Sequence, residues 1–294
     1  ASHTADAASH ADNVAKGLHP TERVEVRAEL CLSCHLGTED KFATHEIMGA
    51  GHPRLAFELS TFEALQPPHW AYDADYLQRK VEIDDFATWT GGILVAARRN
   101  IELLGGPLAH GDGLFPEVAL FDCHSCHHPM SDARWAATTI TAGLQPGAIR
   151  VNDANFVILL PLAAALDRSL HARMLDQIRA LNRSVTGGRD ALAAAAGALG
   201  ASVDALEGLV AGGVDAAARR RTLDGLLARA VRGDYRDYIA AEQAAMAMDL
   251  LLISLDRWEA NKPRIDAVFD AVADDEAYRP GRFVAAAEAL RRGL

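Results

Sequence analysis

Four cysteines constrain this chain more than any other feature. They form two copies of one signature, Cys31-Leu32-Ser33-Cys34-His35 and Cys123-His124-Ser125-Cys126-His127, and no cysteine lies outside them. The pattern Cys-x-x-Cys-His is typical of c-type haem attachment, in which both thiols form thioethers and the histidine binds the iron. The sequence therefore predicts two covalent haems c. The residues expected to hold them are the thioether cysteines Cys31, Cys34, Cys123 and Cys126 and the proximal histidines His35 and His127.

Two other uses of the cysteines stay open at this point, a Cys₄ zinc site and a pair of disulfides. The two pairs are 123 − 31 = 92 residues apart, which is long for the two halves of a zinc site. Neither alternative accounts for the histidine that directly follows both pairs. Disulfides within Cys-x-x-Cys are typical of redox-active sites in thioredoxin-like folds, and the sequence lacks their βαβ pattern.

The sequence predicts a mainly α fold, because apolar residues recur at helical spacing and strand signals are scarce. We expect a haem-bearing N-terminal region with little regular sheet over residues 1–145 and a C-terminal helical bundle over residues 146–294. Glycine pairs and acidic N-caps divide the second region into helices. These are expected from Asn152-Asp153 to about Leu181 with a bend at Pro161, and over Asp190–Leu199, Val203–Val210, Asp215–Val231, Asp234–Glu259, Ile265–Val272 and Arg282–Leu290. A further helix is expected over Phe86–Leu104, where Gly91-Gly92 would permit close packing against a haem or another helix.

The distribution of histidines along the chain indicates candidates for the remaining iron ligands. Eleven of the 12 histidines lie in residues 1–150, and only His171, expected on a bundle helix, lies beyond. We expect His45 and His52 as distal ligands, with a helical turn ending at Met48 and an irregular loop after it. Other possible ligands are His128, His19, Met48 and Met130, whereas His69 and His110 are expected in ordinary loops.

Three further side chains near the motifs could support the cofactors. Arg54 lies in an apolar context and is expected to pair with an anion, for which a haem propionate is a candidate. His124 is expected either to be exposed or to contact an iron ligand without binding the iron itself. Asp122 is expected to be a solvated surface charge.

The first motif and its surroundings resemble a known group. The Cys-x-x-Cys-His-x-Gly of Cys31–Gly37, followed by His45, Gly51-His52-Pro53 and Phe57-Glu58, is similar to periplasmic multihaem cytochromes related to the tetrahaem electron carrier of ammonia-oxidising bacteria. The resemblance covers roughly residues 15–135, with two haem motifs in place of four. It implies that His45 serves the haem of the other motif. Small multihaem cytochromes also use Cys-His-His-Pro, like Cys126–Pro129 here, to ligate neighbouring haems, which makes His128 the alternative ligand.

Charge and hydropathy indicate the kind of partner. The net charge is −11; residues 1–150 carry 11 basic and 20 acidic residues, a balance of −9. This argues against nucleic acid and anionic membranes as partners and favours docking to a basic patch on a redox partner.

We expect no membrane span, a periplasmic location after removal of a signal peptide, and a homo-oligomer through the bundle as one option. The expected function is electron transfer without catalysis. The alternative is a dihaem enzyme or gas sensor with one open iron, acting on peroxide, nitric oxide or hydroxylamine.

Overall fold

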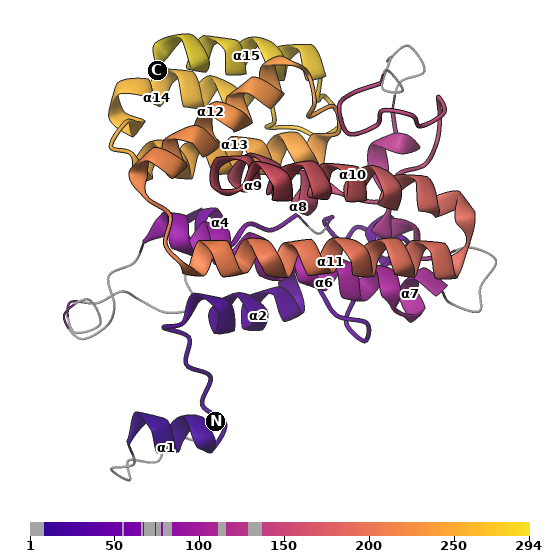
Figure 1. The fold of residues 1–294 in the computed structure, drawn as a ribbon, viewed down its shortest axis with the longest axis horizontal. Coiled ribbons are helices and arrows are strands. Elements are labelled where there is room, and N and C mark those ends of the chain that lie inside the picture. The colour runs from indigo at the N-terminus through magenta and orange to yellow at the C-terminus, as the bar shows by residue number, and fades with distance from the viewer. Residues whose placement is uncertain are drawn as a thin grey trace.

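The structure of the chain is a computed structural model, and it describes residues 9–294 except 55, 66, 68–73, 75–77, 79–83, 111–115 and 129–136. The fold is mainly α, as the sequence predicts (Figure 1). Within the described residues there is no strand, and only two isolated bridges, Thr38–Lys41 and Phe121–Val151, pair extended backbone. The α-helices are α1 (His10–Ala15), α2 (Val24–His35), α3 (His45–Gly49), α4 (Leu59–Leu65), α6 (Asp85–Gly105), α7 (Pro107–His110), α8 (Ala154–Val157), α9 (Leu160–Leu166), α10 (Arg168–Ser184), α11 (Arg189–Ala211), α12 (Ala216–Val231), α13 (Tyr238–Ser254), α14 (Trp258–Asp270) and α15 (Pro280–Gly293). The described residues also form short 3₁₀ turns, η1 (Val118–Leu120), η2 (Cys123–Ser125) and η3 (Val185–Gly187).

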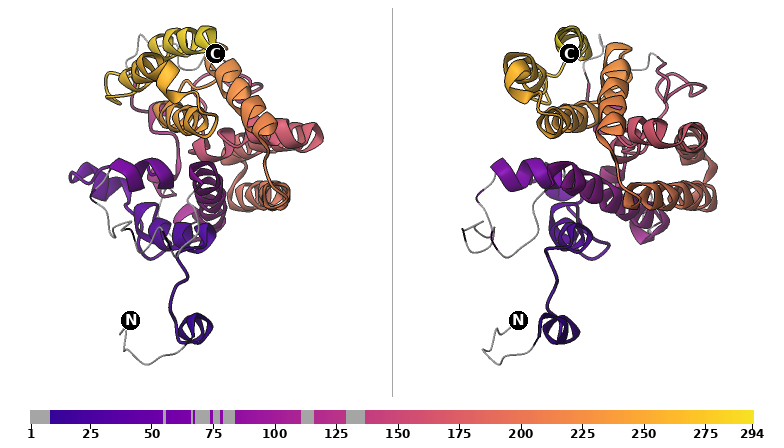
Figure 2. Two further views of the ribbon diagram at one scale, coloured as in Figure 1. Left: turned by 90° about the vertical axis from the view of Figure 1, so that its left-hand side faces the viewer. Right: turned by 60° about the vertical axis from the view of Figure 1, so that its left-hand side comes forward.

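Helix α6 lies at the centre of the molecule. It packs against α2 and α4 of the first half and against α11 and α13 of the second. Figure 2 shows α12 to α15 on the far side of α6 from α2, with α1 standing apart from the rest. One hydrophobic core runs from Phe86 on α6 to Leu290 on α15, so the two expected regions share a core. The boundary near residue 145 stays a prediction.

The glycine pair on α6 permits this packing. A Cβ at Gly91 would lie 2.5 Å from Cγ1 of Val24 on α2, and one at Gly92 would lie 2.9 Å from Cβ of Leu59 on α4. Real Cβ contacts are not this short, so both positions need glycine at this helix separation. The prediction that Gly91-Gly92 serves close packing is confirmed for helix against helix.

Helix boundaries in the second half follow acidic caps. Asp167 accepts hydrogen bonds from the backbone N–H of Ser169 and Leu170, and it starts α10. The single helix expected from residue 152 to 181 is therefore wrong; α8, α9 and α10 replace it, with Pro161 in the first turn of α9, where no N–H donor is required. Conversely, the two helices expected over 190–199 and 203–210 are one continuous α11, because Gly200 stays helical against Ile101 of α6.

Helix α11 differs from the expected hydropathy profile. Its 23 residues are long and apolar enough to cross a membrane by length and composition alone, although the sequence indicated no such segment. It packs on α6 and α10, and buried leucines such as Leu199 and Leu206 face these helices. The expectation of no membrane span stays a prediction.

The glycine contact gives a testable difference between two Gly-to-Ala changes in helices. Gly91→Ala should lower the free energy of unfolding by about 1–3 kcal/mol, because Val24 and α2 must move to admit the methyl group. Gly197→Ala on α11 is the matched control, since its Cβ would meet nothing within 4 Å. The control should raise stability by about 0.5–1 kcal/mol through helix propensity. Chemical denaturation of both variants measures the difference, and equal stabilisation would contradict the packing argument.

Candidate functional site

The first motif occupies the last two turns of α2. Leu32 points into a small cluster with Leu59 and Val95, which fixes the rotation of the helix. Cys31 is half-buried beside this cluster and Cys34 is exposed. The ring of His35 stacks on Phe57, with centroids 4.3 Å apart and planes 15° from parallel. The helix therefore presents both thiols and a histidine of fixed ring plane near its C-terminal end.

The second motif lies in a tight turn held by the residue before it. The carboxylate of Asp122 accepts hydrogen bonds from the backbone N–H of His124 and from the hydroxyl of Ser125, at 3.1 and 3.0 Å. The N–H of His127 then donates to the carbonyl of Cys123 at 2.7 Å. Asp122 is only 8% exposed, so the expectation of a solvated surface charge is wrong. Its side chain shapes the turn that presents Cys123, Cys126 and His127.

His45 lies across from His127. Their ring centroids are 6.0 Å apart with planes 30° from parallel. Both side chains are exposed, and both line one large cavity. Because an imidazole nitrogen binds a first-row metal at about 2.0 Å, two imidazoles on opposite sides of one metal stand on the order of 6 Å apart, centroid to centroid. The spacing of His45 and His127 fits an iron between them.

Glu117 fixes the position of His45. The same carboxylate oxygen accepts from the backbone N–H of His45 at 2.8 Å and from that of Ala119 at 2.9 Å. The first N–H groups of a helix have no partner within it, so Glu117 satisfies the start of α3 from another segment. The hydroxyl of Thr44 accepts from Ile47 in the same turn. Helix α3 ends at Gly49 and an irregular loop follows, close to the expected end at Met48.

The cavity between His45 and His127 has a volume of about 1140 Å³. This is slightly larger than most ligand pockets, which have volumes of about 300–1,000 Å³. Both halves of the chain form its wall, since the α10–α11 turn and the loop before α15 contribute residues. Its lining includes His45, Met48, Arg54, His110, Val118, Cys123, Cys126, His127, Ile149, Thr186, Leu192, Asp275 and Glu276.

Two apolar side chains of the cavity wall bear on what it holds. Val118 and Ile149 are each 46% exposed, among the few large hydrophobic residues that the described chain leaves open. Both line the cavity beside Cys123 and His127. An apolar, flat group attached to the second motif would cover them, and burial of apolar surface is favourable. The residues present therefore fit a covalently attached haem.

Burial also acts on the thiols themselves. The pKa of Cys123 is raised, first by burial and then by the neighbouring Asp122 carboxylate, and Arg54 opposes this in part. The pKa of Cys31 is raised mainly by burial, with a contribution from Glu63. Burial thus disfavours the thiolate form of both cysteines, and the neighbouring carboxylates act in the same direction.

Arg54 has carboxylate partners from the second half of the chain. Its two Nη atoms donate to Glu242 on α13, both at 3.1 Å, and its Nε lies 3.3 Å from Asp275. The guanidinium also lies over the ring of Tyr238, 4.2 Å from its centroid. The expected anionic partner is thus provided by protein carboxylates, although Arg54 still lines the cavity. A contact with a haem propionate stays a prediction.

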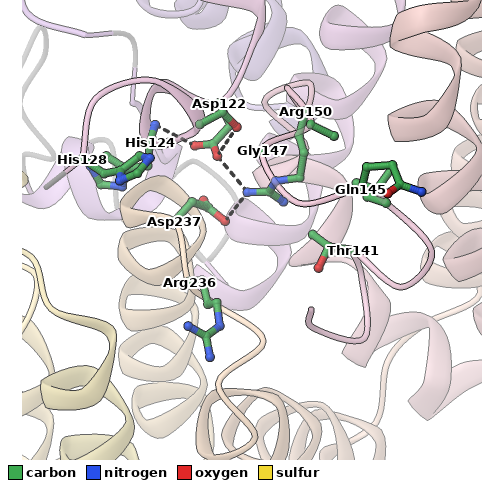
Figure 3. A pocket seen from close by; sticks show the side chains of 12 residues that line it. Asp122, His124, His128, Thr141, Gln145, Gly147, Arg150, Arg236 and Asp237 are labelled. Atoms are coloured by element: carbon green, nitrogen blue, oxygen red, sulfur yellow. Dashed lines mark hydrogen bonds and ion pairs between the residues drawn. The ribbon is translucent and has the colours of Figure 1, made fainter. Parts of the chain in front are cut away.

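The other candidate ligands lie in different places. His52 is exposed, with Nδ1 2.6 Å from the carbonyl oxygen of Pro53. His128 borders a separate cavity of about 80 Å³ with Arg150 and Asp237 (Figure 3). Met48 and His110 line the large cavity, His19 is exposed, and His171 lies on α10 as expected. Met130 and His69 lie outside the described residues.

The sequence interpretation missed Glu117 and Arg150 and left the role of His124 open. His124, expected to be exposed or behind the ligands, accepts through Nδ1 from the N–H of Tyr238, the first residue of α13, at 3.1 Å. Glu117 and Arg150 had no distinguishing pattern, since their partners are distant in sequence. An aspartate two residues before His124 is a recognisable turn signal, and it could have indicated the role of Asp122.

The cysteines are not gathered with other possible metal ligands in the described residues. In the parts that the structure describes, all four cysteines are free. Over the same residues, no group of three or more His, Cys, Asp or Glu side chains is placed to hold a metal ion. A haem iron needs only two protein ligands, so this finding does not bear on the haem prediction.

Comparison of the chain with protein-family models, with curated proteins and with solved structures finds no match. The interpretation of the site therefore depends on the residues and their geometry.

The link between Glu117 and His45 can be tested by hydrogen exchange. Glu117→Ala should reduce the protection of the His45 and Ala119 amides about tenfold or more, because a hydrogen bond to a charged acceptor contributes about 1.5–3 kcal/mol. Glu102→Ala, an exposed glutamate paired with Arg99, is the control and should leave both amides unchanged. Unaltered exchange in Glu117→Ala would show that Glu117 does not fix the start of α3.

Proposed function

We propose that this protein is a dihaem c-type cytochrome that transfers electrons between redox partners outside the cytoplasm. The observation that carries the proposal is the proximity of His127, in the second Cys-x-x-Cys-His turn, to His45: their ring centroids are 6.0 Å apart and both residues line one large cavity. The repeated signature, with no cysteine left over, supports a second haem at the first motif. Haem supplies one-electron chemistry when bound.

Each part of the chain has a defined task in this proposal. The cysteines of each motif attach one haem, and His35 and His127 are the proximal ligands. His45 is the distal ligand at the second motif, and His52 is proposed as a distal ligand for the other haem. The bundle covers the second cofactor, because the α10–α11 turn and the loop before α15 close part of the cavity wall.

Axial saturation favours electron transfer over catalysis. An iron with two histidine ligands has no free position for substrate, and electron transfer then requires little rearrangement. The charge of −9 on residues 1–150 would guide the protein to a basic surface on its partner. A dihaem enzyme or gas sensor is the alternative, and it requires one iron without a distal ligand.

Replacing His45 tests the distal assignment. His45→Ala should convert one haem from low spin to high spin, because it removes the ring that faces His127. His171→Ala is the control, since His171 lies on α10 against Arg229 and away from the motifs. Absorption spectra of both oxidation states report the change. If His45→Ala stays low spin while His128→Ala becomes high spin, the distal ligand at the second motif is His128.

Small ligands separate the carrier from the enzyme or sensor. Carbon monoxide added to the reduced protein, and cyanide added to the oxidised protein, should leave the spectra unchanged because histidines occupy the axial positions. Rapid, stoichiometric binding at one haem would overturn the carrier function and support an open iron.

A further inference from the structure

A buried charged cluster lies directly behind the second motif. Arg150 donates from one Nη to Asp122 at 2.9 Å and to Asp237 at 3.3 Å, and its other Nη lies 3.5 Å from Asp153. Figure 3 shows the guanidinium between Asp122 and Asp237. The four side chains are between 2% and 12% exposed. One cation therefore faces three buried carboxylates.

The cluster connects three elements of the site. Asp122 holds the turn of the second motif, and Asp237 caps α13 by accepting from the N–H of Ala240 at 2.8 Å. Asp153 precedes α8 and accepts from Nδ2 of Asn182 on α10 at 2.7 Å. The carboxylate of Asp153 accepts no hydrogen bond from the first N–H groups of α8. Its contacts are instead with Arg150 and Asn182. The groups that face Asp153 are thus Arg150, Asn182, Asp237 and Asp122.

An excess of buried negative charge is costly, and binding a proton is the usual response. The pKa of Asp153 is raised to about 6, above all by burial; Asp237 and Asp122 contribute to the rise, and Arg150 and Asn182 oppose it. The same carboxylates hold the pKa of Arg150 above its ordinary value against the effect of burial, so Arg150 keeps its charge. Because the carboxylates interact, the proton belongs to the cluster as a whole.

Solvent can supply that proton. The cavity of about 80 Å³ beside the second motif is lined by Asp122, Arg150 and Asp237, and the other titratable or charged side chains on its wall are His124, His128 and Arg236. A polar cavity of this size has room for water molecules. Three of the four cluster members therefore border a polar cavity.

We propose that the cluster of Arg150, Asp122, Asp153 and Asp237 takes up a proton when the haem of the second motif is reduced, so that the protein carries a proton together with an electron. This inference rests on the proposed function. The electron comes from the redox partner and reduces ferric to ferrous iron, while a solvent proton converts one carboxylate of the cluster to a carboxylic acid. Reduction adds negative charge beside the cluster, which favours the protonated form.

Potentiometry of the fully haem-loaded chain tests this coupling. The pKa of the cluster is higher in the reduced protein, so the midpoint potential of one haem should fall as pH rises above about 6. The fall is limited to about 59 mV for each tenfold change in proton concentration. Asp153→Asn should abolish the slope. Asp176→Asn, whose side chain is 76% exposed, removes the same charge and should keep the slope of the unmodified protein.

A measurement without substitutions covers the case in which Asp153→Asn does not fold. Infrared difference spectra of the unmodified protein should show a protonated carboxyl band that appears on reduction at pH 7. A pH indicator should show uptake of a fraction of a proton per electron. A flat potential between pH 5 and 8, a slope retained in folded Asp153→Asn, or no carboxyl band would overturn the proposal.

The haem content of the samples distinguishes a failure of the proposed function from a failure of the proton coupling. Samples without haem c contradict the proposed function itself. Samples with two low-spin haems and a potential independent of pH contradict only the proton coupling.

Discussion

The close packing of α6 against α2 is the contact on which the rest of the structure depends. Gly91 lets Val24 approach the backbone of α6, and Gly92 does the same for Leu59. The first motif is thereby attached to a helix whose other faces are buried against α11 and α13. The cluster of Leu32 with Val95 lies in the same interface, and Arg27 on α2 donates to the hydroxyl of Thr88 on α6 at 3.2 Å.

The second motif depends on polar contacts rather than on a regular helix. Asp122 holds the turn, Arg150 binds Asp122, and His124 accepts from the start of α13. Glu117 brings α3 to the same place and sets His45 opposite His127. Buried networks of this kind are rigid when every member is paired, which suits a site whose ligands must stay in place. The proton proposed for the carboxylate cluster would relieve its one imbalance, three carboxylates against one guanidinium.

Local signals predicted the elements, and long-range contacts escaped prediction. The acidic cap at Asp215 and the turn before Gly49 are short patterns with a local physical cause. The mainly α fold was predicted from apolar residues at helical spacing, which is also a local signal. The predicted break in α11 does not occur at Gly200, which lies beside Ile101 of α6, about a hundred residues earlier in the chain. The partners of Arg54 on α13 and of Asp122 at Arg150 are likewise set by tertiary packing. The sequence does not reveal which distant residue pairs with a charged side chain. For this reason Asp122 was predicted to be at the surface.

Mass spectrometry of proteolytic peptides tests the central claim most directly. The account predicts one covalent haem on the peptide that contains Cys31 and Cys34 and one on the peptide that contains Cys123 and Cys126, with no free thiol in either. Free thiols, a disulfide within either pair, or bound zinc in protein matured where haem is attached would contradict it.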